Sequence, residues 1–207
     1  MNEATRAEHW QKVYTTKGEG DVSWFQEEPA ISLELIDSVG ANPDTRIVDI
    51  GGGASRLVDS LLARGFHDIA VLDVSDAALI AAKARVGEAE KHVRWIAADV
   101  TRWQPNQIYD IWHDRAAFHF LTEAEDRKAY VARLLTALRP GGHAIIGTFA
   151  IDGPEKCSGL PVRRYDAAGL SSELGPGFAL VEARRHDHVT PWQSVQHFQF
   201  CVFQRRG

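Results

Sequence analysis

The sequence contains few cysteines and no long apolar segment. Its 207 residues include two cysteines, Cys157 and Cys201, too few for the disulfide framework of a small secreted protein. No apolar run reaches the roughly 18 residues that a membrane-spanning helix needs, so we expect no membrane contact. The amino terminus is polar and lacks the apolar core of an export signal. These absences together predict a protein of the reducing cytoplasm.

Basic charge is also scarce. Lys and Arg number 23 against 28 Asp and Glu, which gives a formal net charge of −5. A duplex-binding protein usually carries a basic stripe that displaces counterions from phosphates, whereas here basic residues adjoin only in pairs such as Arg163-Arg164. We therefore expect no nucleic-acid partner. With 44% hydrophobic and 25% charged residues, the chain has the composition of a globular protein that buries a full core.

Short apolar segments alternate with helical ones through the middle of the chain. The patterns predict strands at 46–50, 69–73, 93–97, 108–112 and 143–149, and helices at 6–14, 31–39, 57–62, 77–86 and 123–138. This alternation is typical of an α/β protein with a parallel sheet and helices on both faces. Two further strand-like runs, 178–189 and 195–203, have a connection too short for a crossover, so they predict a carboxyl-terminal antiparallel hairpin.

A glycine run follows the first strand of this core, in Asp49-Ile50-Gly51-Gly52-Gly53-Ala54-Ser55. Glycines at the carboxyl end of a parallel strand let the backbone approach a ligand closely. The run is not a complete dinucleotide fingerprint, because Arg56 stands where the third glycine would be, and the chain has no phosphate-binding P-loop motif. The glycines therefore predict a ligand site and leave the ligand open.

Carboxylates stand at the ends of the next two strands as well. Asp73 follows the last glycine at a spacing where an acid can accept hydrogen bonds from both hydroxyls of a ribose. Asp99 precedes Val100 after the third strand, and a carboxylate beside a backbone N–H can recognise the amine edge of adenine. Acids at three successive strand ends predict a slot for a nucleoside with a small charged tail.

In these motifs the chain resembles the class I S-adenosylmethionine-dependent methyltransferases. The resemblance covers about residues 46–149 and is carried by the segments 47–55, 71–73, 98–100, 109–114 and 138–142. It implies a Rossmann-like, seven-stranded methyltransferase sheet, mostly parallel, with S-adenosyl-L-methionine as cofactor and S-adenosyl-L-homocysteine as product. It also implies a single domain over 1–207. Residues 1–30 would form a helix and lid, 46–149 the cofactor core, and 150–207 a substrate-side loop, helix and hairpin.

The resemblance also implies roles for individual residues. The cofactor would be held by Asp49, Gly51, Gly52, Gly53, Ser55, Asp73, Val74, Asp99, Val100 and His113. Near the end of the fourth strand, His113, Asp114 and His119 are the candidate catalytic residues, because an acceptor that carries a proton needs a base. The aromatic residues Trp10, Tyr14, Trp24, Phe25 and Phe118 would form a lid over cofactor and acceptor.

A finer resemblance leads to lysine methyltransferases of translation elongation factors. It rests on Trp24-Phe25, on Ser55 after the glycines and on Asp114-Arg115. The acceptor is left open between a protein lysine and a small molecule. Two other classes compete with methyl transfer: a nucleotide-binding oxidoreductase of the NAD type, and a non-catalytic module that binds the cofactor.

Two further features of the sequence are candidate sites. His186, His188 and His197 share the predicted hairpin, but no cysteine or carboxylate cluster accompanies them, so we expect no metal site. Cys157 falls in the loop before the last helix, where it is either a contact to the acceptor or an inert thiol.

Overall fold

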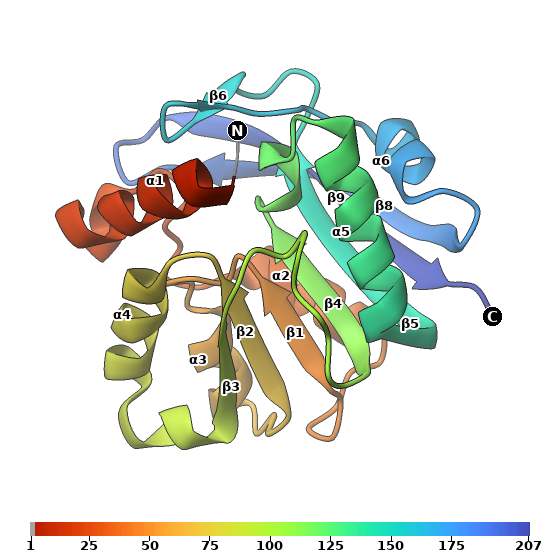
Figure 1. The fold of residues 1–207 in the computed structure, drawn as a ribbon, viewed down its shortest axis with the longest axis horizontal. Helices are drawn as coiled ribbons and strands as arrows, with labels where there is room; N and C mark the ends of the chain where they lie inside the picture. Colours follow the sequence, from red (N-terminus) through yellow and green to blue (C-terminus); the bar gives the residue numbers. More distant parts are fainter. Residues whose placement is uncertain (1–2) are drawn as a thin grey trace.

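The computed structural model describes residues 3–207 and contains one large sheet with helices on both faces (Figure 1). The seven strands of this sheet are, in spatial order, β3 (Val93–Ala97), β2 (Ile69–Asp73), β1 (Ile47–Ile50), β4 (Tyr109–Arg115), β5 (Leu138–Phe149), β9 (Val195–Arg205) and β8 (Phe178–Val189). The first five run parallel, and β9 pairs antiparallel with both β5 and β8. This topology confirms the predicted fold, including the antiparallel pair at its edge.

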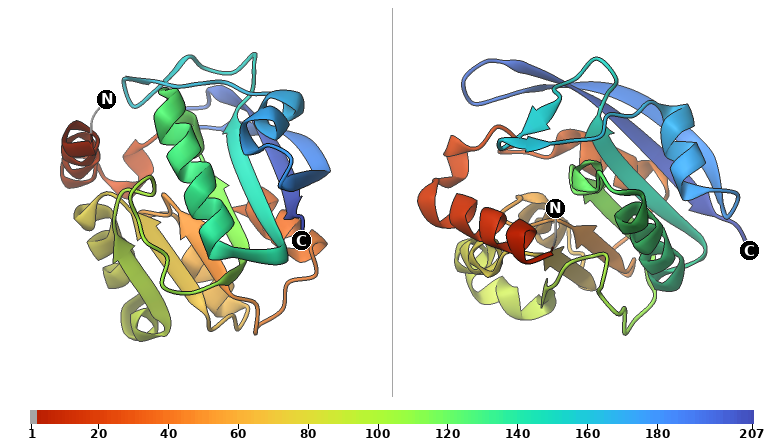
Figure 2. Two further views of the ribbon diagram at one scale, coloured as in Figure 1. Left: turned by 45° about the vertical axis from the view of Figure 1, so that its right-hand side comes forward. Right: turned by 45° about the horizontal axis from the view of Figure 1, so that its top comes forward.

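The helices form a layer on each side of the sheet (Figure 2). One layer contains α2 (Ala30–Ser38), α3 (Leu57–Ala63) and α4 (Asp76–Val86), and the other contains α5 (Ala124–Ala137) and α6 (Ala167–Leu174). Short 3₁₀ turns cover Glu19–Asp21, Gly87–His92 and Phe118–Phe120, and a small hairpin pairs β6 (Lys156–Cys157) with β7 (Leu160–Pro161). Helix α1 (Glu3–Thr16) belongs to neither layer and lies across the edge of the sheet beside α4 (Figure 1).

Burial explains why the central strands read as continuous apolar runs. Every residue of β1 and β2 is buried, since helices cover both faces there. Local caps then end the strands and begin the helices. The Ser75 hydroxyl accepts a hydrogen bond from the Ala78 N–H and so starts α4 directly after Asp73. The turn after β2 therefore leaves its acid at the carboxyl end of the sheet.

Two strand boundaries differ from the prediction by three residues or more. Strand β4 continues to Arg115 instead of ending at 112, and β5 begins at Leu138 instead of 143. Tyr109 pairs with Leu138, and after a shift in register Ile111 pairs with His143. The segment between them is accommodated as an irregularity within β5, so its Pro-Gly-Gly sequence does not stop the strand. The longer β4 carries Arg115 to the carboxyl edge of the sheet.

The segment before α2 and strand β8 meet on one side of this edge. In β8, His188 Nε2 lies 2.6 Å from the main-chain oxygen of Ser23, which precedes α2. None of the helices in residues 3–207 is long and apolar enough to cross a bilayer.

Candidate active site

The glycine run after β1 forms a turn that only small residues can fill. Gly51 has φ 64°, and a Cβ there would lie 2.7 Å from the Cβ of Ala117. Gly53 has φ 42°, and a Cβ there would lie 2.7 Å from Oδ2 of Asp73. The turn thereby brings the ends of β1, β2 and β4 together.

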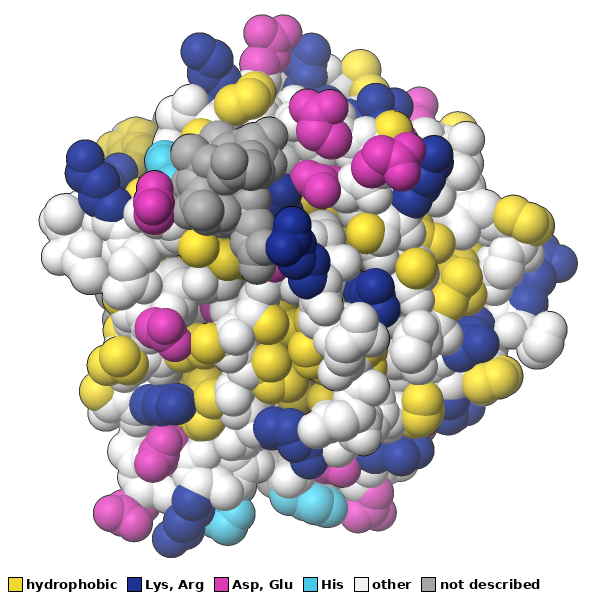
Figure 3. Space-filling model, viewed as in Figure 1, with side chains coloured by type: hydrophobic (Ala, Val, Ile, Leu, Met, Phe, Trp, Pro, Cys, Tyr) yellow, Lys and Arg dark blue, Asp and Glu magenta, His cyan; other side chains and the backbone are white. Residues whose placement is uncertain are grey.

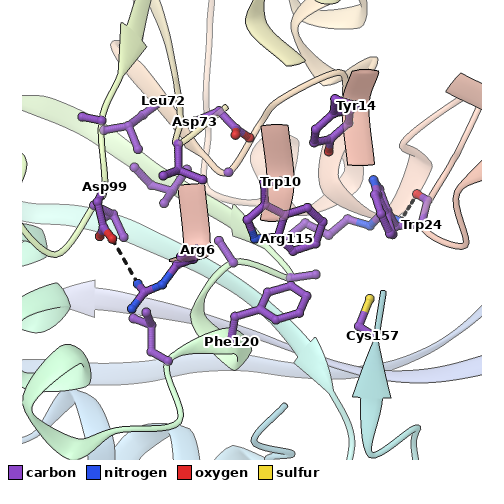
Figure 4. A pocket seen from close by; sticks show the side chains of 18 residues that line it. Arg6, Trp10, Tyr14, Trp24, Leu72, Asp73, Asp99, Arg115, Phe120 and Cys157 are labelled. Carbon is purple, nitrogen blue, oxygen red and sulfur yellow. Dashed lines mark hydrogen bonds and ion pairs between the residues drawn. The ribbon is translucent and has the colours of Figure 1, made fainter. Parts of the chain in front are cut away.

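A pocket with an empty volume of about 750 Å³ opens beside this turn, beneath α1 (Figure 4). The ends of the first three strands contribute Ile50, Gly51, Leu72, Asp73, Val74, Ala98, Asp99 and Val100, and the end of β4 contributes Arg115, Ala116, Ala117, Phe120 and Leu121. The remaining wall consists of Arg6, Trp10, Tyr14, Trp24 and Cys157. On the face shown in Figure 3, hydrophobic side chains gather near the middle, with Lys and Arg side chains around them.

One end of the pocket is acidic. Oδ1 of Asp73 accepts a hydrogen bond from the Ser75 N–H at 2.8 Å, and burial, reinforced by the charge of Asp49, raises the pKa of Asp73 to about 7. Oδ1 of Asp99 accepts from the N–H and the hydroxyl of Thr101, at 2.8 and 2.7 Å. Oδ2 of Asp99 is buried without a hydrogen-bond partner and lies 3.2 Å from Nη1 of Arg6. These carboxylates fit hydroxyl and amino donors such as those of a nucleoside.

Helix α1 closes over that end through polar contacts. Nη2 of Arg6 donates to Asp126 at 2.6 Å while Nη1 faces Asp99. Oε1 of Gln11 accepts from the Ser75 hydroxyl at 3.1 Å and from the Ala77 N–H at 3.2 Å. The helix is therefore attached both to α5 and to the start of α4, on either side of the pocket.

The other end of the pocket is aromatic and cationic. Nη2 of Arg115 donates to the main-chain oxygen of Trp24 at 2.6 Å (Figure 4). The guanidinium lies 5.8 Å from the centre of the Phe198 ring. Burial lowers the pKa of Arg115 to about 10, so the group stays charged at neutral pH. Cys157 lies nearby, and burial raises the pKa of its thiol to about 11. The ring of Trp10 contacts Trp24 edge-on with centroids 5.6 Å apart.

The three residues predicted to be catalytic do not line this pocket. His113 is buried, with Nδ1 2.7 Å from Oδ1 of Asp49 and Nε2 2.9 Å from the Ser32 hydroxyl. Both ring nitrogens are thus occupied inside the core. The His113 side chain lies in the core because β4 is a central strand covered on both sides.

Asp114 and His119 are equally enclosed. The Asp114 carboxylate accepts hydrogen bonds from the N–H groups of Ala117 and Phe118 and from the Tyr130 hydroxyl; burial raises its pKa to about 6. Nδ1 of His119 accepts from the Phe149 N–H, and burial together with the charge of Arg115 lowers its pKa to about 3. Both side chains hold the β4–α5 connection in shape.

The predicted cofactor residues divide into two groups. Gly51, Asp73, Val74, Asp99 and Val100 line the pocket. Asp49 and Gly52 lie behind the glycine turn, where the Asp49 carboxylate is paired with His113. Gly53 packs against Asp73, and Ser55 lines a neighbouring pocket with Arg85. Of the glycine turn, Gly51 is therefore the residue that lines the pocket.

The predicted lid residues also divide. Trp10, Tyr14 and Trp24 line the pocket. Phe25 instead lines the neighbouring pocket, with the Arg56 guanidinium 5.4 Å from its ring centre. Phe118 is fully buried against Tyr130 and Tyr165, so it is a core residue and no part of a roof.

The hairpin histidines do not converge on a metal. Nε2 of His188 contacts the Ser23 oxygen, and Nδ1 of His197 lies 2.7 Å from Oδ1 of Asp187. Within residues 3–207, no group of three or more His, Cys, Asp or Glu side chains is arranged to hold a metal ion.

Sequence reasoning gave no pocket role to Arg6, Arg115 or Phe120. Arg6 belongs to no motif, and only the tertiary position of α1 brings it to Asp99. Arg115 had a usable signal: side chains alternate along a strand, so Arg115 points to the same face of β4 as His113 and Ile111. What the sequence did not reveal was that β4 extends that far.

Comparisons with known proteins agree with this geometry. A family model described as a methyltransferase domain matches residues 47–142. Nodulation protein S of Sinorhizobium fredii is 28% identical over 64% of this chain and 59% of its own length. The eEF1A lysine and N-terminal methyltransferase of Mus musculus is 25% identical over 95% of this chain and 31% of its own length. The chain therefore spans less than two thirds of either relative.

A solved structure shows the same architecture over the whole chain. The N-methyltransferase NodS from Bradyrhizobium japonicum, in complex with S-adenosyl-L-homocysteine, superposes with a TM-score of 0.73 and 17% identity, covering 100% of both chains. The matched segment begins with β1 and its glycine turn and includes Asp73 and Asp99. Residues 47–142 thus match a methyltransferase domain, and the fold of the whole chain is that of a methyltransferase solved with S-adenosyl-L-homocysteine.

Proposed function

We propose that this protein transfers the methyl group of S-adenosylmethionine to a small molecule bound at the Arg115 end of the pocket. The observation that carries the proposal is one continuous pocket beneath α1, acidic at Asp73 and Asp99 and cationic at Arg115. Its two ends suit two different ligands, a nucleoside cofactor and an acceptor.

The residues at the acidic end fit the cofactor. Asp73 would accept from the ribose hydroxyls. Oδ2 of Asp99, which is ion-paired with Arg6 but accepts no hydrogen bond, would accept from the adenine amine. Gly51 would let the backbone approach the methionine part. When bound, the cofactor supplies a methyl group on a positively charged sulfur, so the transfer chemistry is the cofactor's own.

The protein then contributes position and exclusion of water. Trp10, Tyr14 and Trp24 cover the pocket, and the apolar side chains between the two charged ends leave little room for solvent. Holding two reactants in line can contribute about 7–11 kcal/mol to lowering a barrier. This arrangement supports catalysis by orientation, with no requirement for a residue that forms a covalent intermediate.

The walls of the acceptor end favour a small molecule over a protein side chain. Cys157 of the β6–β7 hairpin lies on one side and Trp24 on another, and both segments pass over the edge of the sheet. A substrate protein would need its main chain to approach between them. An acceptor the size of a metabolite fits beneath them without that opening.

A protein lysine acceptor is the second candidate. The observation in its favour is the mouse relative, named for lysine and N-terminal methylation, which aligns with 95% of this chain.

We further propose that residues 1–207 act as one domain, in which α1 closes the cofactor core and residues 150–207 complete the acceptor end. Because Cys157 and Cys201 are both free, a reducing compartment such as the cytoplasm suits the protein.

Calorimetric titration of the full chain with S-adenosyl-L-homocysteine, and separately with NAD, tests the cofactor assignment. We expect the first to bind and the second not. Incubation with S-adenosylmethionine labelled in its methyl group, together with separated small-molecule and protein fractions of a lysate, then tests the acceptor. Label in the small-molecule fraction supports the proposal, and a discrete labelled protein band contradicts its acceptor. NAD binding alone would replace methyl transfer with a redox function, and cofactor binding without any transfer would make the protein a binding module.

A further inference from the structure

The Arg115 guanidinium is a cation in the pocket wall without a matching carboxylate. It contacts a neutral main-chain oxygen and the face of an aromatic ring. Among residues 3–207, no carboxylate forms an ion pair with it; the charge of Asp49 acts on it, but that carboxylate is hydrogen-bonded to His113. A guanidinium carries five N–H donors, so one carbonyl leaves most of them unused. Buried charges are normally paired, and this one faces a cavity.

The other guanidinium of the pocket, that of Arg6, is paired with carboxylates. Arg6 lies 3.2 Å from Asp99 and 2.6 Å from Asp126, so two carboxylates share its charge. Arg6 and Arg115 line the same pocket from opposite ends. The difference in pairing therefore marks the Arg115 end as the place where an incoming anion would be stabilised.

The pocket also offers no base to an acceptor at that end. Of the described residues lining it near Arg115, Tyr14 and Cys157 are the ones that could take up a proton once ionised, but burial raises the pKa of both. Each is therefore protonated at neutral pH. His113 and His119, the nearest histidines along the chain, do not line the pocket. An ammonium acceptor would have no group there to remove its proton.

We propose that Arg115 binds the reacting group of the acceptor, and that this group is an anion, a carboxylate or a thiolate. The inference rests on the proposed methyl transfer and narrows its substrate class. A lone pair of the acceptor's anionic oxygen or sulfur would form the new bond to the methyl carbon. The bond from that carbon to the cofactor's sulfur would break, with its electron pair staying on sulfur. A neutral ester or thioether and a neutral cofactor product result, and no proton is released.

Two probes of the same shape and opposite charge test this. The full-length protein, saturated with S-adenosyl-L-homocysteine, is titrated by calorimetry with benzoate and with benzylamine, which is an ammonium at neutral pH. We expect benzoate to bind and benzylamine not to bind. Thiophenolate in place of benzoate is expected to bind as well, since the shared feature is the negative charge. Benzylamine binding as tightly as benzoate, or benzoate failing to bind, overturns the proposal.

Variants then assign the effect to Arg115. Arg115→Gln keeps an N–H donor for the Trp24 oxygen but removes the charge, and Arg115→Lys keeps the charge. Because a charge-assisted pair contributes about 10–100-fold to affinity, Arg115→Gln is expected to lose that factor for benzoate while Arg115→Lys retains most of it. Arg64→Met, which removes an exposed cation paired with Asp37, is the control and should bind benzoate like the wild type.

The cofactor also carries a carboxylate, which Arg115 could bind in place of the acceptor. The same variants distinguish these two roles of Arg115. Affinity for S-adenosyl-L-homocysteine alone is expected to change less than about threefold in Arg115→Gln, a small fraction of a charge-assisted pair. If that affinity instead falls about tenfold while benzoate binding is retained, Arg115 holds the cofactor and the proposal is wrong. Failure of the wild type to bind S-adenosyl-L-homocysteine at all would refute the proposed function itself. Thermal melting of each variant shows whether it is folded.

Discussion

The two ends of the pocket are built in different ways. The acidic end comes from a continuous stretch of chain, in which β1 ends in the glycine turn, β2 ends in Asp73 and the turn after β3 presents Asp99. The cationic end is assembled from distant segments: Trp24 before α2, Arg115 at the end of β4 and Cys157 in a hairpin. One end is therefore local and recognisable as a motif. The other exists only once the chain is folded, and it can change without altering the cofactor motif.

The largest effect is expected in the core behind the pocket, at His113. Replacement by Phe leaves the buried Asp49 carboxylate and the Ser32 hydroxyl without a partner. Stripping a buried charge of its partner costs about 3–5 kcal/mol, so urea denaturation should show a loss of that size. His67→Phe, at a half-exposed site, is the control. If His113→Phe is as stable as the wild type but cannot transfer methyl groups, His113 takes part in catalysis.

At the acidic end, Asp73→Asn should weaken binding of S-adenosyl-L-homocysteine by about 10–100-fold, because hydrogen bonds to a charged acceptor contribute about 1.5–3 kcal/mol. Calorimetry measures this directly. Asp76→Asn, three positions further along and exposed, is the matched control. Equal affinities for the two variants would show that Asp73 does not contact the ribose.

The glycine turn offers a smaller and more selective test. Alanine at Gly53 or at Gly159 meets a left-handed backbone, with φ 42° and 79°, a strain of about 1–2 kcal/mol in either place. Only at Gly53 does the new Cβ also approach Asp73, at 2.7 Å, whereas nothing lies within 4 Å at Gly159. Affinity for S-adenosyl-L-homocysteine should fall by about tenfold, or about 1.4 kcal/mol, in Gly53→Ala and stay unchanged in Gly159→Ala. Similar affinities would mean that the turn and Asp73 act independently.

The smallest expected effect is a dependence on pH. Burial raises the pKa of Asp73 to about 7, and the ribose hydroxyls prefer its ionised form. Binding of S-adenosyl-L-homocysteine should therefore weaken by up to about tenfold from about pH 8 to about pH 6, and Asp73→Asn should abolish the trend. In the absence of ligand, the raised pKa of Asp73 affects the free energy of unfolding in the opposite direction. The folded state holds the proton more tightly, so this contribution is lost as pH rises from the ordinary aspartate range through about 7.

The sequence predicted the fold and the acidic end of the pocket because both depend on short-range patterns. Strand β2 has the predicted bounds, since an apolar run before Asp73 and a Ser75 cap define it locally. The assignment of His113 to catalysis had no such support. A strand-end histidine has the same local pattern whether it faces a cavity or Asp49, and its neighbours from α2 and β1 decide between them.

Arg115 illustrates which part of the pocket the sequence does not reveal. Its pocket position depends on where β4 ends and on two contacts that are distant in sequence, the Phe198 ring of β9 and the Trp24 oxygen. Phe118 is the reverse case, a residue that the sequence predicts in the lid but that packs in the core. An aromatic residue close to a strand end packs into the core as readily as into a lid. Exposure of a side chain is a tertiary property, which patterns along one chain do not encode.

The contact between His188 and Ser23 joins positions 165 apart in the chain. During synthesis the acidic end can therefore form as soon as β1 to β4 have left the ribosome, whereas the segment carrying Trp24 gains its second anchor only when β8 follows. A nascent or prematurely terminated chain would have a cofactor site open to water on its acceptor side. Pairing of β8 with the rest of the sheet is then the step that encloses the acceptor side of the pocket.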